Sequence, residues 1–208
     1  MDTHLNDLIY KAKHGDIDAM LSVAKYYMEQ EDYINSHEYL LMAAQKGNTW
    51  AEHKVGVNFC FGIGGIEKNL PLGVKYLQYA ADKDNTHAEF TLAIVCEGVE
   101  EAKAYLKENT PENAYLYYLE KAAKHGHAQA QVMLGNMCIE GKVLKYDLEQ
   151  AIFWWGCASL HKEETAEDER KEAKNKLQLL LNVIPKSEID AIFNEIKTNY
   201  PTYAYHNY

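Results

Sequence analysis

The fold is decided by residues 51–84, which read AEHKVGVNFCFGIGGIEKNLPLGVKYLQYAADKD. In the first half, small and apolar residues recur at steps of four: Ala51, Val55 and Phe59. That spacing puts them on one face of a helix, which we call helix A. In the second half, Tyr76-Leu77 precede Ala80-Ala81 and form the apolar face of a second helix, helix B. Glycines between the halves mark a turn, so the stretch predicts two connected helices.

The same pattern recurs along the chain. Each copy ends in a pair of small residues, and eight residues after the first member of that pair an alanine begins the next helix A. The pairs are Ala43-Ala44, Ala80-Ala81 and Ala122-Ala123, with a weaker copy at Ala158-Ser159 and a truncated copy at Lys11-Ala12. The alanines that follow are Ala19, Ala51, Ala88, Ala130 and Ala166. The period drifts between about 32 and 42 residues while the eight-residue step is kept. A fixed turn from helix B to the next helix A, with variable loops elsewhere, explains this.

A second complete copy runs from Ala130 to Lys162 and carries Leu134, Gly135, Gly141, Leu144, Asp147, Ala151, Trp154, Trp155 and Ala158. Together the copies resemble the Sel-one-like repeat family, a relative of the tetratricopeptide repeat, whose pattern runs A-x3-L-G-x2-Y-x2-G-x-G-V-x2-D-x3-A-x2-W-Y-x-K-A-A-x2-G. The resemblance covers about residues 5–162. It implies an all-α fold, an α-solenoid of about four repeats whose antiparallel helix pairs stack into a right-handed superhelix.

We expect one repeat domain over residues 1–208. It comprises an N-terminal half-repeat helix (1–15), repeats at 16–48, 49–85, 86–127 and 128–162, and C-terminal capping helices with a tyrosine-rich tail (163–208). Repeat one has a shortened loop between its helices. Repeat three has gained about six residues between Gly98 and Asn113, and these can form an extra helical turn.

The net charge and the composition of the chain indicate which partners and which cellular location to expect. The chain has a formal net charge of −10, which opposes binding to nucleic acid and anionic membranes and favours a basic protein partner. No apolar run at the N-terminus suggests a signal peptide, and none elsewhere is long enough to span a bilayer, so we expect a cytoplasmic protein.

The cysteines Cys60, Cys96, Cys138 and Cys157 form no CxxC pair. In a reducing compartment they are expected to be buried thiols. A Cys138–Cys157 disulfide is the alternative for an exported protein.

The sequence contains no motif that supports an enzymatic function. The glycine-rich residues 61–66 lack the Lys-Ser/Thr pair and preceding strand of a phosphate loop, so we interpret them as a turn. His125-Gly-His127 has no further ligands at zinc spacing, and no cysteine has a histidine partner in a recognisable signature. We therefore predict no catalytic residues, no metal and no cofactor.

The resemblance also indicates a binding groove lined by helix A. In tetratricopeptide relatives the groove residues stand one before, and two, six, nine and ten after, the helix A alanine. From the residues at these positions we predict that the following bind a protein: Lys25, Trp50, His53, Phe61, His87, Phe90, Ile94 and Asn136. The alternative is that these side chains pack on neighbouring helices and form no binding surface.

Two functional hypotheses follow. The first is a non-enzymatic protein–protein interaction scaffold or adaptor that binds a protein segment in its concave groove. The second is an acidic inhibitor or immunity-type protein that neutralises a basic effector or toxin. The strength and salt dependence of partner binding would distinguish them, because a basic target is attracted by long-range electrostatics.

Overall fold

The computed structural model describes residues 3–107, 110–161, 164–180, 182 and 184–199. These residues form helices joined by turns and loops, with no β-strand among them, and the chain is an all-α repeat solenoid. It folds as two compact units, residues 1–115 (unit 1) and 116–208 (unit 2), and each is described by itself. Within the described residues, no helix combines the length and apolar character needed to cross a membrane.

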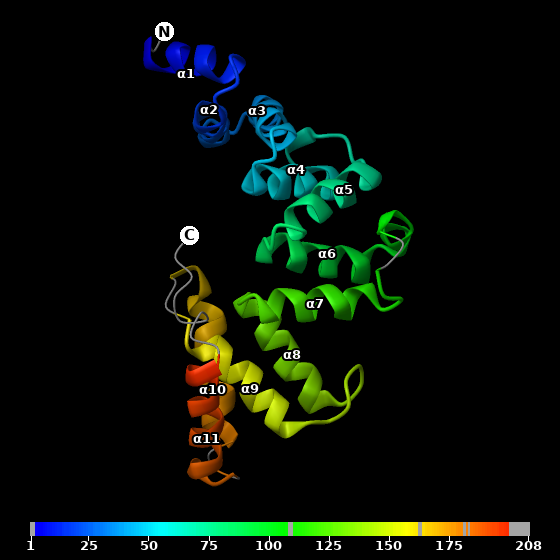
Figure 1. Ribbon diagram of the computed structural model, residues 1–208, viewed down its shortest axis with the longest axis vertical. Coiled ribbons are helices and arrows are strands. Elements are labelled where there is room, and N and C mark those ends of the chain that lie inside the picture. The colour runs from blue at the N-terminus through cyan, green and yellow to red at the C-terminus, as the bar shows by residue number, and fades with distance from the viewer. Residues whose placement is uncertain (1–2, 108–109, 162–163, 181, 183, 200–208) are drawn as a thin grey trace. The chain divides into compact units, whose positions relative to one another are not determined.

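Unit 1 consists of helix pairs in chain order (Figure 1). Its elements are α1 (Thr3–Lys13), α2 (Ile17–Glu29), α3 (Tyr33–Gln45), α4 (Thr49–Phe61), η1 (Ile63–Gly65), α5 (Leu70–Ala81), α6 (Thr86–Gly98) and η2 (Glu100–Tyr105). The helices α2 and α3 pack against each other, as do α4 and α5. Helices α2, α4 and α6 are the predicted helices A, and α3 and α5 are the predicted helices B.

Unit 2 repeats the arrangement and adds two helices. Its elements are α7 (Ala114–Lys124), which begins at the end of unit 1, α8 (Ala128–Glu140), α9 (Leu148–Ser159), η3 (Glu164–Ala166), α10 (Glu167–Leu180) and α11 (Lys186–Asn199). Helix α9 packs against α8, α10 and α11, and α10 also contacts α8. The predicted tyrosine-rich tail, residues 200–208, lies outside the described residues.

The helices α2, α4, α6 and α8 each begin at a side-chain cap. The residue three positions before the helix A alanine, which we call the marker alanine, accepts a hydrogen bond from that alanine's backbone N–H, and this satisfies one of the free donors of the first turn. The caps and distances are Asp16 (3.0 Å), Asn48 (2.9 Å), Asn85 (2.8 Å) and His127 (3.3 Å). The residue before the cap has a positive φ, as at Gly47 (84°) and Asp84 (57°). One turn geometry is thus used before these four helices, which explains the eight-residue step to Ala19, Ala51, Ala88 and Ala130.

The helices of a pair approach closely at glycines. A Cβ atom built on Gly73 of α5 would lie 2.5 Å from Sγ and 2.8 Å from the backbone nitrogen of Cys60 on α4. One built on Gly56 of α4 would lie 2.7 Å from Cγ of Leu77. This confirms that the small residue five positions after the helix A alanine permits close helix packing.

Polar side chains join the start of the first helix of a pair to the end of the second helix. After α5, Lys83 Nζ donates to both carboxylate oxygens of Glu52 on α4, at 2.7 and 2.8 Å, and to the carbonyl of Gly47, at 2.9 Å. After α9, the His161 Nε2 atom lies 3.0 Å from Oε1 of Gln131 on α8. Glu52 and Gln131 are both buried, and each follows its helix A alanine by one residue. We call this pairing the basal tie.

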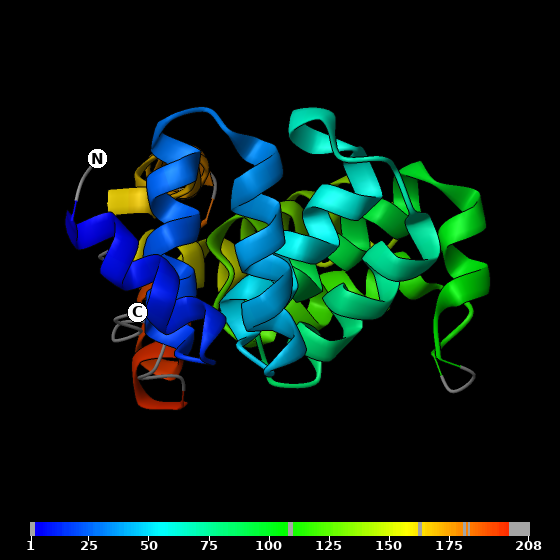
Figure 2. The same ribbon diagram turned by 90° about the horizontal axis from the view of Figure 1, so that it is seen from above.

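The loops from helix A to helix B vary in length. They span residues 30–32, 62–69, 99–113 and 141–147. In the longest one, η2 packs beside α5 and α6 and buries Ala102, which confirms the predicted extra helical turn (Figure 2).

All four cysteines are buried and free. The alternative of a Cys138–Cys157 disulfide is therefore wrong for this structure. Burial raises the pKa of the Cys60 thiol to about 12 and that of Cys96 to about 11. Burial also raises the pKa values of Cys138 and Cys157, so the thiols act as small apolar side chains.

The helices α10 and α11 cover α9. Ile196 of α11 packs on Cys157, and both side chains are fully buried. A Cβ atom on Gly156 would lie 2.5 Å from Cδ1 of Ile196, so α11 also uses a glycine for its approach. Arg170 of α10 donates from Nη1 to the carbonyl of His161 at 3.0 Å. This charged hydrogen bond connects α10 to the end of α9.

Candidate functional site

Seven of the eight predicted binding residues lie in unit 1. They come from the three successive helices A: Lys25 from α2, Trp50, His53 and Phe61 from α4, and His87, Phe90 and Ile94 from α6. We call these seven residues the unit 1 strip. The eighth, Asn136, lies on α8 in unit 2.

Two aromatic side chains of the strip are open to solvent. Trp50 is 42% exposed and Phe61 is 49% exposed, and they stand near the two ends of α4. The Lys54 ammonium lies 5.6 Å from the centre of the Trp50 ring, a cation–π contact that orients the indole. Large aromatic side chains held at a surface are the residue type that contributes most to protein interfaces.

A small polar group joins α4 to α6 in the strip. His53 Nε2 lies 3.3 Å from Thr91 Oγ1, and the Thr91 hydroxyl donates to the His87 carbonyl at 2.7 Å. Because the hydroxyl proton is already used, the His53 ring nitrogen must be the donor. The His53 and His87 rings stack with their centres 5.9 Å apart. Thr91 was not predicted from the sequence, since its position is absent from the groove pattern.

His53 is neutral at physiological pH. Its side chain is partly buried, and this burial, with smaller contributions from the positive charges of Lys54 and His87, lowers its pKa from 6.5 to about 4. The centre of the strip therefore presents an uncharged imidazole held by a fixed hydrogen bond.

The remaining strip residues differ in exposure. Phe90 and Ile94 are half-buried, so packing accounts for part of their surface. His87 is exposed, and Lys25 is exposed with its ammonium 3.9 Å from Glu29. The strip thus combines half-buried side chains with exposed ones.

Asn136 has a local structural partner. Its Oδ1 atom accepts a hydrogen bond from Trp155 Nε1 at 3.1 Å. A Cβ atom on the adjacent Gly135 would lie 2.5 Å from the same indole nitrogen, and Lys176 lies 5.5 Å from the ring centre. Asn136 therefore orients Trp155 within unit 2.

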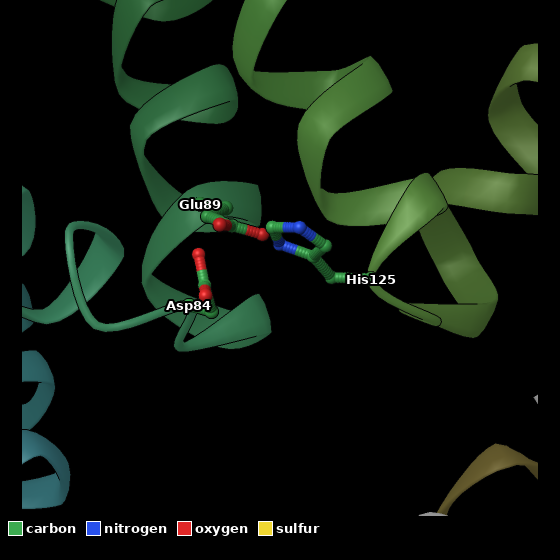
Figure 3. A group of neighbouring side chains, drawn as sticks. All are labelled: Asp84, Glu89 and His125. Atoms are coloured by element: carbon green, nitrogen blue, oxygen red, sulfur yellow. The ribbon is translucent and has the colours of Figure 1, made fainter. Parts of the chain in front are cut away.

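The histidines near residue 125 have separate roles in the fold. His127 caps α8, which accounts for one member of the His-Gly-His motif. In unit 1, Asp84 lies in the turn before α6 and Glu89 in its first turn, as Figure 3 shows. The third residue drawn there, His125, follows α7 in unit 2, so we assign no metal site to the three.

Comparisons with known proteins agree with the repeat pattern. A family model described as Sel1 repeat matches residues 17–48, 51–85, 116–127 and 128–161, more than half of the chain. It leaves out residues 86–115, which hold α6 and the long loop. No curated protein sequence matches the chain significantly.

Among the solved structures similar to this chain are two proteins of low sequence identity, of which the first shares the fold of this chain. The crystal structure of a Sel1 repeat protein from Oxalobacter formigenes has a TM-score of 0.68 and 19% sequence identity, covering 98% of this chain and 58% of that one. The protein c5321, a protective antigen of uropathogenic Escherichia coli strains displaying an SLR fold, has a TM-score of 0.47 and 17% identity, covering 95% and 49%. The chain therefore spans about half of the length of these proteins. With the helix pairs, the caps and the four matched segments together, the chain belongs to the Sel1 repeat family.

Proposed function

We propose that this chain is a non-enzymatic scaffold that binds a segment of a partner protein along the unit 1 strip. Sel1 repeats generally serve as modules for protein–protein interaction. The observation that carries the proposal is the exposure of Trp50 and Phe61 on α4, on either side of the hydrogen-bonded group of His53, Thr91 and His87.

The physical argument rests on preorganisation. The His53–Thr91 hydrogen bond joins α4 to α6, and the bond from Thr91 to the His87 carbonyl orients the hydroxyl within α6, so a partner meets side chains that are already ordered. The two aromatic rings offer large apolar areas, and the neutral imidazole avoids the cost of burying a charge. A partner segment with apolar or aromatic side chains suits this surface.

The inhibitor hypothesis is supported by charge. A net charge of −10 would speed association with a basic protein and would make binding strongly dependent on salt. An adaptor that uses the apolar strip depends less on salt and more on Trp50 and Phe61. Salt dependence and mutation therefore separate the two functions.

The test is affinity capture from a lysate of the source cell, followed by measured affinities for each captured protein at low and moderate salt. The strip variant is Trp50→Ala with Phe61→Ala. The matched control is Tyr79→Ala on α5, because Tyr79 is also 42% exposed and has a lysine ammonium, that of Lys75, 5.7 Å from its ring. Both variants should keep the helical circular dichroism of the wild type.

We expect the strip variant to bind at least tenfold more weakly, a loss of about 1.4 kcal/mol, and the control to change affinity less than twofold. Equal affinity of the strip variant and the wild type would refute the strip as the binding surface. A single basic partner whose tight binding disappears with added salt, and is insensitive to the strip variant, would favour the inhibitor.

A further inference from the structure

The basal tie has a different composition in the first helix pair. In the second pair, Glu52 follows the marker alanine and binds Lys83 through both carboxylate oxygens. In the first pair, the residues at these two positions are Met20 and Lys46. The first pair thus keeps the lysine of the basal tie, as Lys46, but has the thioether of Met20 in place of the Glu52 carboxylate.

Lys46 nevertheless occupies the place that Lys83 has in the next repeat. The Lys83 ammonium lies 3.6 Å from the Cβ position of Gly47, in the turn before α4. The Lys46 ammonium lies 3.3 Å from the Cβ position of Gly15, in the equivalent turn before α2. Met20 is 1% exposed and fills the site of the carboxylate with apolar surface. Over residues 3–107, the Lys46 ammonium makes no hydrogen bond or ion pair.

A cavity of about 450 Å³ lies next to this ammonium. It is lined by Lys13, His14, Gly15, Met20, Met42, Gln45 and Lys46. His14 is oriented there by a hydrogen bond between its Nδ1 and the Tyr10 carbonyl, at 2.7 Å. The lining thus combines two ammonium groups and an imidazole with two methionine side chains. It suits a ligand with an anionic end and an apolar stem.

We propose that this cavity binds the carboxylate of an acidic side chain from a partner protein. The Glu52 carboxylate shows how such a group meets a lysine at this turn, with its two oxygens 2.7 and 2.8 Å from the ammonium. Charge–charge interactions are screened beyond about 8 Å at physiological salt, so the nearby lysines outweigh the negative charge of the whole chain. This site does not depend on the unit 1 strip.

The first test uses NMR with two probes that differ only in charge: N-acetyl-glutamate N-methylamide and its glutamine analogue. Constant ionic strength is kept by replacing chloride with the anionic glutamate probe and by leaving the chloride concentration unchanged when the neutral glutamine probe is added. We expect saturable shifts of the Gly15 amide and the Met20 and Met42 methyl groups with the glutamate probe, and a dissociation constant on the order of 1–10 mM. The glutamine probe should bind at least tenfold more weakly. Equal shifts with both probes would overturn the proposal.

Variants then test whether the Lys46 ammonium is the group that binds the probe. Lys46→Gln should weaken binding of the glutamate probe at least tenfold, whereas Lys75→Gln, the same change on the exposed surface of α5, should leave the affinity within twofold. Met20→Glu supplies the carboxylate from within the chain and should block the probe, whereas Met20→Leu, which preserves the apolar volume, should not. Full binding by Lys46→Gln, or by folded Met20→Glu, would contradict the assignment.

A reciprocal variant leaves the first helix pair untouched. Glu52→Met gives the second pair the composition of the first, and should create a new response of the Gly47 amide to the glutamate probe. Absence of that response in a folded variant would show that the tie geometry alone does not bind a carboxylate. Inorganic phosphate as a third probe tests the ligand class, because more than tenfold tighter binding of phosphate would overturn the assignment to carboxylate.

Discussion

Replacing Gly73 by alanine tests the packing of α4 against α5. The added Cβ would lie 2.5 Å from Cys60 Sγ, 2.8 Å from the Cys60 backbone nitrogen and 3.0 Å from the Gly56 carbonyl oxygen. Two of these three atoms belong to the backbone, so the helices must move apart. Overpacking costs about 3 kcal/mol when the backbone must shift, and the better helix propensity of alanine returns up to about 1 kcal/mol. We expect a net loss of about 2 kcal/mol.

The assay is thermal and urea unfolding followed by circular dichroism. For a chain of this length, 2 kcal/mol corresponds to a melting temperature lower by about 4–8 °C. Gly98→Ala is the matched control, because Gly98 is the last residue of α6 and no atom lies within 4 Å of its Cβ position. The control should be unchanged or more stable by up to about 1 kcal/mol. If Gly73→Ala proves as stable as Gly98→Ala, the close approach of α4 and α5 is wrong.

Three further predictions concern titration, the basal tie and the thiols. Because the folded protein holds the pKa of His53 near 4, below its ordinary value of 6.5, protons bind preferentially to the unfolded state between these pH values. Stability should therefore fall by about 2 kcal/mol from pH 7 to pH 5, and urea unfolding of His53→Gln should show a pH dependence smaller by that amount. Lys83→Met leaves the buried Glu52 carboxylate without its cation and should lower the free energy of unfolding by about 2–3 kcal/mol. Adding Glu52→Met to the same chain should restore most of that loss, and equilibrium urea unfolding measures both effects. Ellman's reagent at pH 8 should label no cysteine of the native protein and all of them in denaturant; rapid labelling under native conditions would contradict the burial of Cys60, Cys96, Cys138 and Cys157.

Much of the fold could be predicted from the sequence because the repeated spacing is dictated by helix geometry. The step from Ala51 to Val55 and Phe59 identifies one face of α4, and the alanine pair at Ala80 identifies the end of α5. The caps Asp16, Asn48 and Asn85 stand in the sequence at a constant distance from the marker alanines, yet this signal was missed. His127 would have been harder to recognise, since histidine is not a preferred N-cap.

The candidate site could be predicted only in part. The groove pattern indicated positions on helix A, but exposure depends on how far the neighbouring helices extend, which a single sequence does not encode. Trp50 and Phe61 are open, whereas Phe90 is half-buried and Asn136 is engaged by the Trp155 indole. The link between His53 and Thr91 joins residues 38 positions apart, so it could be seen only after folding.

The basal tie has a consequence for how this protein tolerates insertions. Because Lys83 and Glu52 lock the start of one helix to the end of its partner, the opposite end of the pair is the only one left to accept additional chain. Residues inserted at the opposite end lengthen a loop, and the entropic cost of closing a loop rises only slowly with its length. Residues inserted next to Lys83 would instead break its ion pair with the buried Glu52 carboxylate. Residues 62–69 occupy that permissive end of the α4–α5 pair, and three of them form η1 (Ile63–Gly65). Additional surface can thus be inserted between α4 and α5 without disrupting the packing of the two helices.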